Sequence, residues 1–345
     1  MAVTAHPICF LIEKFHATIY RWFQFMPREI VMSTTKFIAA PRLRELQQLE
    51  TWRTAAAFIF DWFAIAAIIA VSEYIGGWLI YFVAIILIAG RMHAIASLIH
   101  EFAHVRFVLD RKVNDWVGDI VCAWPLFVTV DSYRRNHLQH HQHTNTEKDP
   151  DYRVKYGTAR FTFPQRVANL VRNLSLYVIG VNAVRDLRTG LDRLNDKTAA
   201  NKGYIAARLG FYAVTGTLLF AIGGLDELVF YWMVPYLSLF MTIMYVRSVA
   251  EHFAIENIDQ KLEGTRTVVP LFWERAFFGP HCVSYHLEHH IYPSVPFYNL
   301  PKLHAALMEN PDYRARAHIT RGYTTGLLRE CLAHGNYREL PALAL

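Results

Sequence analysis

The stretch WLIYFVAIILIAGRMHAIASLIHEFAH, residues 78–104, joins a hydrophobic run long enough to cross a membrane to two histidines at its end. A helix rises about 1.5 Å per residue, so His100 lies roughly 33 Å and His104 roughly 39 Å along the helix from Trp78. The hydrocarbon core of a bilayer is about 30 Å thick. Both histidines are therefore expected just outside the membrane, one helical turn apart on one face of the helix.

Hydrophobic runs elsewhere in the chain predict a membrane protein built of helices. The four predicted spans, paired into two transmembrane hairpins, are residues 54–71, 78–99, 205–222 and 228–249. The composition agrees, because charged residues make up 19% of the chain, below the roughly 25% of a typical soluble domain. Asp61 lies inside the first span, and we expect it to face protein rather than lipid. The predicted fold class is an all-α integral membrane protein.

Lysine and arginine indicate how the chain is oriented. The two short turns between paired spans carry neither residue, whereas the segments before, between and after the hairpins carry nearly all of them. By the positive-inside rule, both termini and the central region are predicted to be cytoplasmic. This topology explains the net charge of +6, so we predict no nucleic-acid partner. The stretch from Ile8 to Met26 is aromatic but interrupted by charges, and it is predicted to lie at the membrane interface.

Histidines gather in three clusters at the predicted cytoplasmic ends of these spans. The clusters read H-E-F-A-H at His100 and His104, H-L-Q-H-H at His137, His140 and His141, and H-L-E-H-H at His286, His289 and His290. A further histidine, His252, lies roughly 36 Å along the last span from Leu228, which places it at the same level. So many imidazoles suit two metal ions, held in a cytoplasmic helical cap, better than one. Imidazole binds iron, zinc, copper and nickel, so the ligand type alone leaves the metal open.

The cluster pattern resembles the membrane-bound fatty acid desaturase superfamily, which also contains hydroxylases and ketolases. The resemblance rests on H-x-x-x-H and two copies of H-x-x-H-H, arranged around two transmembrane hairpins over about residues 50–310. The stretches H-L-Q-H-H-Q-H-T-N-T-E-K-D-P-D (137–151) and H-C-V-S-Y-H-L-E-H-H-I-Y-P-S-V-P (281–296) resemble its desaturase branch. The second stretch is also similar to sphingolipid desaturases.

The resemblance implies a non-haem diiron centre that uses O₂ to remove hydrogen from an unactivated methylene of a fatty-acyl lipid. The implied iron ligands are His100, His104, His137, His140, His141, His252, His286, His289 and His290. The candidates to accept hydrogen bonds from ligand imidazoles are Glu101, Asp149, Asp151 and Glu288. Loss of a second hydrogen gives a double bond, whereas rebound of oxygen gives an alcohol. An apolar tunnel in the protein is expected to select the carbon that reacts.

Two alternatives to a desaturase stay open. A hydroxylase or ketolase of a carotenoid, alkane or sphingoid lipid would use the same iron site, although the stretches T-N-T-E-K-D-P-D and Y-P-S-V-P favour desaturation. A metal-ion transporter would need ionisable ligands within the membrane. The sequence offers only Asp61, Arg91 and His93 at that depth, so a transporter is the more remote alternative.

Electrons are expected to come from a separate protein. Some members of the superfamily carry a fused cytochrome b5 domain with an H-P-G-G motif, but here His6 and Pro7 are followed by Ile8 and Cys9. The predicted donor is a ferredoxin, or a cytochrome b5 with its reductase.

The chain is predicted to divide into three parts. We expect a cytoplasmic or interfacial segment over residues 1–53, a membrane desaturase domain over residues 54–310 and a cytoplasmic tail over residues 311–345. A bacterial plasma membrane is favoured over the endoplasmic reticulum as its location.

Overall fold

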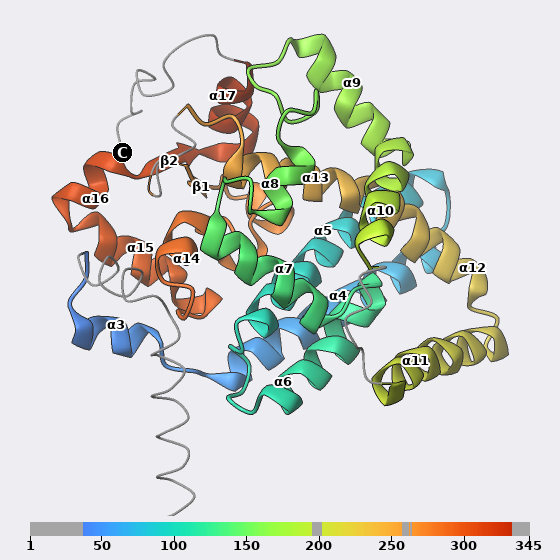
Figure 1. Cartoon of the computed structure of the whole chain (residues 1–345). Coiled ribbons are helices and arrows are strands. Elements are labelled where there is room, and N and C mark those ends of the chain that lie inside the picture. Colours follow the sequence, from blue (N-terminus) through green and yellow to red (C-terminus); the bar gives the residue numbers. More distant parts are fainter. Residues whose placement is uncertain (1–36, 195–201, 257–261, 263, 333–345) are drawn as a thin grey trace, which may run out of the picture.

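The computed structural model describes residues 37–194, 202–256, 262 and 264–332 (Figure 1). The predicted interfacial stretch from Ile8 to Met26 lies outside these residues and stays a prediction. Helices dominate the described chain, beginning with the short α3 (Ala40–Leu46). The described helices that are long and apolar enough to cross a membrane are Thr51–Ile75, Trp78–Ala103, Lys202–Ala221 and Leu225–His252. Each of them overlaps one of the four predicted spans.

Helices α4 (Thr51–Ile75) and α5 (Trp78–Ala103) pack along each other and are joined by a tight turn. Gly76 and Gly77 form this turn with φ angles of 72° and 88°, which glycine adopts without a steric penalty from a Cβ atom. In the most apolar part of α5, 72% of the residues are buried, against 22% in α4. α5 is therefore the central helix, and α4 shields one side of it.

A buried ion cluster connects these two helices to the C-terminal half of the chain. Asp61 of α4 is fully buried and accepts hydrogen bonds from Arg91 Nη1 (3.0 Å) and His281 Nε2 (2.7 Å). Arg91 Nη2 also donates to the carbonyl oxygen of Ala276 (2.7 Å). The prediction that Asp61 faces protein is confirmed, and the cluster holds the segment 276–281 against the membrane helices.

The two remaining candidate spans differ in their packing. α11 (Lys202–Ala221) has no buried residue, and it is held near its start by Tyr204, whose hydroxyl donates to Asp119 Oδ2 (2.6 Å). The last span runs from α12 (Leu225–Glu227) to α13 (Met241–His252) through π-helical turns on both sides of Pro235. Proline lacks the N–H group that a regular helix requires, which accounts for these turns.

The region between α5 and α11 is also helical. Its helices are α6 (Arg111–Gly118), α7 (Val130–His143), α8 (Pro150–Lys155), α9 (Val167–Val178) and α10 (Val181–Leu194). α6 and α7 pack against α5, while α9 packs against α13 and bends by 75° into α10. Figure 1 shows this green and yellow-green region beside the C-terminal part, which is orange and red. The region thus contacts both spans that carry predicted ligands.

The C-terminal part contains a departure from the predicted all-α fold. β1 (Arg266–Val269) pairs in parallel with β2 (His318–Arg321), so that Arg266 lies beside His318. Both strands are rich in β-branched residues, which favour extended backbone. The connection between them contains α14 (His286–Ile291), α15 (Leu300–Met308) and α16 (Pro311–Arg316), as a parallel pair requires a long crossover. The all-α prediction is right for the mostly helical chain and wrong for this two-stranded sheet.

Residues 311–332 pack into the body of the protein, although we predicted a tail from residue 311. Tyr323, Leu327 and Cys331 share a buried hydrophobic cluster with Tyr245 and Val249 of α13. The last described helix, α17 (Leu328–Leu332), therefore lies against the end of the last span.

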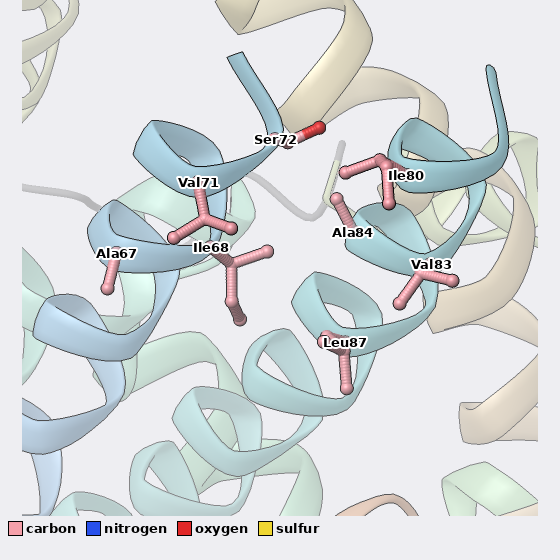
Figure 2. Close-up of a pocket in the computed structure, with 8 residues that line it drawn as sticks. All are labelled: Ala67, Ile68, Val71, Ser72, Ile80, Val83, Ala84 and Leu87. Carbon is pink, nitrogen blue, oxygen red and sulfur yellow. The ribbon is translucent and has the colours of Figure 1, made fainter. Parts of the chain in front are cut away.

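An apolar groove of about 240 Å³ lies between α4 and α5 near their connecting turn (Figure 2). Figure 2 shows Ile68 and Val71 of α4 opposite Val83 and Leu87 of α5. Leu87 precedes His100 by about 20 Å along α5, so this groove is remote from the histidine clusters.

We predict that Asp61→Asn lowers the free energy of unfolding by about 3 kcal/mol, because it leaves the Arg91 charge without its buried carboxylate. The measurement is the denaturation midpoint of the protein purified in detergent. The control is the double variant Asp61→Leu with Arg91→Leu, which removes both charges and should be less destabilised than Asp61→Asn. Equal stability of Asp61→Asn and the wild type would contradict this role of the ion cluster.

Candidate metal centre

The nine histidines predicted as ligands converge from four helices. α5 carries His100 and is followed directly by His104, and α13 ends with His252. The remaining six lie on α7 and α14 and are His137, His140, His141, His286, His289 and His290. Each cluster lies at the end of a span or on a short helix beside it. The structure therefore brings all nine predicted residues into one place.

Their ring nitrogens form two groups, and within each group one nitrogen of every residue lies within 4.8 Å of the others. The five-histidine group consists of His100, His104, His137, His141 and His289. The four-histidine group consists of His140, His252, His286 and His290. Each H-x-x-H-H cluster contributes to both groups, as expected if its adjacent histidines point to different metals.

Within each group, Nε2 atoms of different histidines lie close to one another. In the five-histidine group, His137 Nε2 lies 3.0 Å from His104 Nε2 and 3.0 Å from His141 Nε2. In the four-histidine group, His252 Nε2 lies 3.0 Å from His140 Nε2 and 2.9 Å from His286 Nε2. A chain of facing Nε2 atoms thus runs through each group.

The donor set fits metal ions better than hydrogen bonds alone. A neutral imidazole has a single N–H group, and His140 uses its Nδ1 hydrogen to donate to Asp149 Oδ2 at 2.8 Å. The Nε2 atom of His140 therefore carries a lone pair, and it faces both His252 Nε2 (3.0 Å) and His290 Nε2 (3.3 Å). A cation between such nitrogens would satisfy several lone pairs at once.

Burial favours the neutral form of most of the site histidines. It lowers the pKa of His137, His141, His286, His289 and His290 well below the ordinary value, and neighbouring histidines lower it further. Burial also lowers the pKa of His104 to about 3, helped by the charges of Arg106 and Arg134. The neutral form is the one that binds a metal, so the site is prepared for ions without first losing protons.

Two of the four predicted carboxylates lie against site histidines. Asp149 is buried and accepts the hydrogen bond from His140 described above. Glu101 Oε1 lies 3.6 Å from His100 Nδ1, and its other oxygen accepts from the backbone N–H of Phe297 (3.0 Å). The stretch Y-P-S-V-P directly precedes Phe297, so its conformation positions the N–H group that Glu101 accepts.

The other two carboxylates form their hydrogen bonds with residues outside the two histidine groups. Glu288, contrary to the prediction, is bound by Tyr313 (2.8 Å), His304 (2.5 Å) and Thr267. It follows His286 by two residues, so it lies on another face of α14 and anchors that helix from outside. Asp151 accepts a hydrogen bond from Asn136 Nδ2 and pairs with Lys155, and its charge also acts on His252 of the four-histidine group.

Glu251, which was not among the predicted carboxylates, also lies against a site histidine, with its Oε1 3.5 Å from His286 Nδ1. Arg247 Nε donates to the same carboxylate oxygen at 2.6 Å and holds it in place. The available signal was its position directly before His252. The contact crosses from α13 to α14, however, so the spacing of residues along either helix does not reveal it.

A second apolar groove, of about 560 Å³, lies between α5, α9, α13 and the C-terminal part of the chain. Its walls include Leu174 of α9, Thr242, Val246 and Val249 of α13, and Ile86 of α5. The three α13 residues have the spacing of one helix face, and the next position on that face is Phe253, which directly follows His252. The groove therefore follows α13 towards the four-histidine group.

Comparison with known proteins supports this picture. The model of the fatty acid desaturase family matches residues 76–322. Dihydrorhizobitoxine desaturase of Bradyrhizobium elkanii is 28% identical over 270 residues, which cover 75% of this chain and 76% of the relative. The sn-1 oleoyl-lipid 12-desaturase of Anabaena variabilis is 25% identical over 230 residues, covering 61% and 64%. The sn-1 acyl-lipid omega-3 desaturase (ferredoxin) of Synechocystis sp. is 22% identical over 326 residues, covering 84% and 89%.

We predict that the metal-free protein loses stability as the pH falls below about 6.5. In the unfolded chain histidines titrate near 6.5, whereas in the folded chain the lowered pKa of buried site histidines such as His137 and His289 keeps these two neutral. The unfolded state then binds more protons, so each such histidine costs up to about 1.4 kcal/mol per pH unit below that value. The measurement is the thermal unfolding midpoint of chelator-treated protein in detergent between about pH 7.5 and 5.5. A midpoint that stays constant over this range would contradict the prediction.

Proposed function

The chain belongs to the fatty acid desaturase family, and we propose that it introduces a C=C bond into the acyl chain of a membrane lipid at a histidine-ligated diiron centre. The chain is an oxidoreductase, as its desaturase relatives indicate. The observation that carries the finer proposal is the convergence of nine imidazoles into two adjacent groups. This arrangement supports one iron ion in each group.

Some of the described residues would bind the metal ions, and others would orient these ligands. Each iron would be bound by the Nδ1 or Nε2 atoms of one group, with Glu101, Asp149 and Glu251 orienting the imidazoles. Two bound iron ions would supply the activation of O₂ that an unactivated C–H bond requires. In the overall reaction, the lipid loses two hydrogens, and O₂ takes these with two further electrons and two protons to give two waters.

The 560 Å³ groove supports an acyl chain as the substrate. Its lining residues are almost entirely apolar, and one of them, Ile86, precedes His100 by fourteen residues, or about 21 Å along α5. The groove runs along the membrane-spanning parts of α5 and α13, where a lipid tail would lie. The tail would lie in the groove with one section near the metal groups and the head group towards water.

The relatives support a lipid substrate and an external electron donor. The names of two of them specify acyl-lipids, and one name specifies ferredoxin. We therefore propose a ferredoxin, or a cytochrome b5 with its reductase, as the donor of the two electrons. The dihydrorhizobitoxine desaturase shows by its name that relatives differ in substrate, so the head group is left to experiment.

We further propose that the metal centre and both termini are cytoplasmic, in a bacterial plasma membrane. His100 and His252 lie at the C-terminal ends of their spans, away from the turns at Gly76 and Gly223. These turns carry no lysine or arginine, which favours the opposite side of the membrane for them.

We predict that cells expressing the wild type accumulate a lipid lighter by two hydrogens, and that His140→Ala abolishes it. The change removes an imidazole that faces both His252 and His290. The matched control is His143→Ala on the same helix, because His143 belongs to neither group. Mass spectrometry of total lipids with iron analysis of the purified protein gives the readout. A lipid heavier by one oxygen would overturn desaturation in favour of hydroxylation.

We also predict that Val246→Trp lowers product formation at least about tenfold while iron content stays at the wild-type level. A bulky side chain in the groove displaces the substrate, and misplacement by an ångström can cost about 100-fold in rate. The control is Val171→Trp on the exposed face of α9, outside the groove. Unchanged turnover in Val246→Trp would rule out the groove as the acyl site.

A further inference from the structure

Two buried arginines donate hydrogen bonds to backbone carbonyls at the C-terminal ends of the two spans that carry ligands. Arg134 lies at the end of α5, and Arg266 lies at the end of α13. Their exposed fractions are 5% and 0%. The last carbonyl groups of a helix have no partner within the helix, and they carry partial negative charge. A buried guanidinium at this position can satisfy several of them at once.

Arg134 contacts the last residues of α5. Its Nε donates to the carbonyl oxygen of Ala103 (2.7 Å), and its Nη2 donates to that of Phe102 (2.8 Å). Asp115 neutralises the charge through two hydrogen bonds of 2.5 and 2.7 Å. These carbonyls lie between His100 and His104, which both belong to the five-histidine group.

Arg266 contacts the last residues of α13 in the same way. Its Nη1 donates to the carbonyl oxygens of Ala250 (2.9 Å) and Phe253 (3.0 Å), and its Nη2 donates to that of Ala254 (2.6 Å). Glu330 of α17 neutralises the charge at 2.7 Å. These carbonyls lie on both sides of His252, which belongs to the four-histidine group.

Neighbouring contacts strengthen this division. Arg134 precedes His137 of the five-histidine group by one turn of α7. Thr267, next to Arg266 on β1, donates to Glu288 of α14, the helix that carries His286 and His290 of the four-histidine group. Each arginine is thus tied to two elements that supply ligands to its group, while α7 also supplies His140, and α14 also supplies His289, to the other group.

We propose that Arg134 and Arg266 are positioning residues that fix the two metal groups separately, Arg134 the five-histidine group and Arg266 the four-histidine group. The proposal rests on the proposed function, because it assumes that each group holds one metal ion. Lysine can replace the charge of either arginine but not its planar set of five donors, so it cannot contact several carbonyls in the same geometry. Loss of the contacts frees one helix end and the ligands beside it.

The test measures iron per chain in purified full-length protein, for Arg134→Lys and Arg266→Lys alone and combined with a ligand variant of each group. The ligand variants are His104→Ala for the five-histidine group and His252→Ala for the four-histidine group. Residues that act on one site give non-additive effects, whereas residues that act on separate sites give additive ones.

Each arginine variant is expected to hold about half of the wild-type iron. Arg266→Lys should lower the iron content of His104→Ala further but leave that of His252→Ala unchanged. Arg134→Lys should show the reverse pattern. An equal further loss in both ligand variants, or no loss from either lysine substitution, would overturn the proposal, because a general loss of stability does not distinguish between the groups.

Circular dichroism and gel filtration identify any variant that fails to fold. In that case Asp115→Asn and Glu330→Gln replace them in the test. These variants weaken the ion pairs that hold the two arginines against the helix ends, and they must give the same crossed pattern. Wild-type protein that binds fewer than two irons per chain would overturn the proposed diiron function itself. Wild-type protein with two irons but without the crossed pattern would overturn only the roles of the arginines.

Discussion

The site depends on one constraint: nine imidazoles from four helices must aim their nitrogen lone pairs into two small volumes. Without a cation, the close approach of such nitrogens is unfavourable, so the surrounding fold must hold them there. α5 has 26 residues and the last span has 28, and these similar lengths bring His100 and His252 to the same level. The short helices α7 and α14 then need only lie across these ends to complete both groups.

The spans and all nine histidines were predictable from the sequence, because each rests on a regular property of helices. A fixed rise per residue placed His100, His104 and His252 at one level before any tertiary contact was known. The H-x-x-H-H spacing likewise indicated that neighbouring rings in a cluster point to different metals. The lone acid Asp61 could be assigned to the protein interior because a carboxylate facing lipid is too costly.

Side-chain contacts between different helices could not be predicted from the spacing of residues within one helix. Glu288 lies inside an H-x-x-H-H cluster yet faces Tyr313 and His304, whereas Glu251 reaches across from α13 to His286. Which neighbour a carboxylate meets depends on how two helices are rotated against each other, and the spacing within one helix does not determine that rotation. The parallel pairing of β1 with β2 is equally hidden, because its partners are separated by a long crossover.

Every ligand-bearing helix is also held from outside by a buried polar group. Asp149 holds His140 of α7, Glu288 ties α14 to β1 and α15, and Arg134 and Arg266 grip the ends of α5 and α13. Burying such charges contributes little to stability, since desolvation offsets most of their attraction. Their directional hydrogen bonds do, however, restrict how each helix can rotate and slide. Apolar packing alone would tolerate small shifts of these helices, and a site that requires several nitrogens to meet at one point would not.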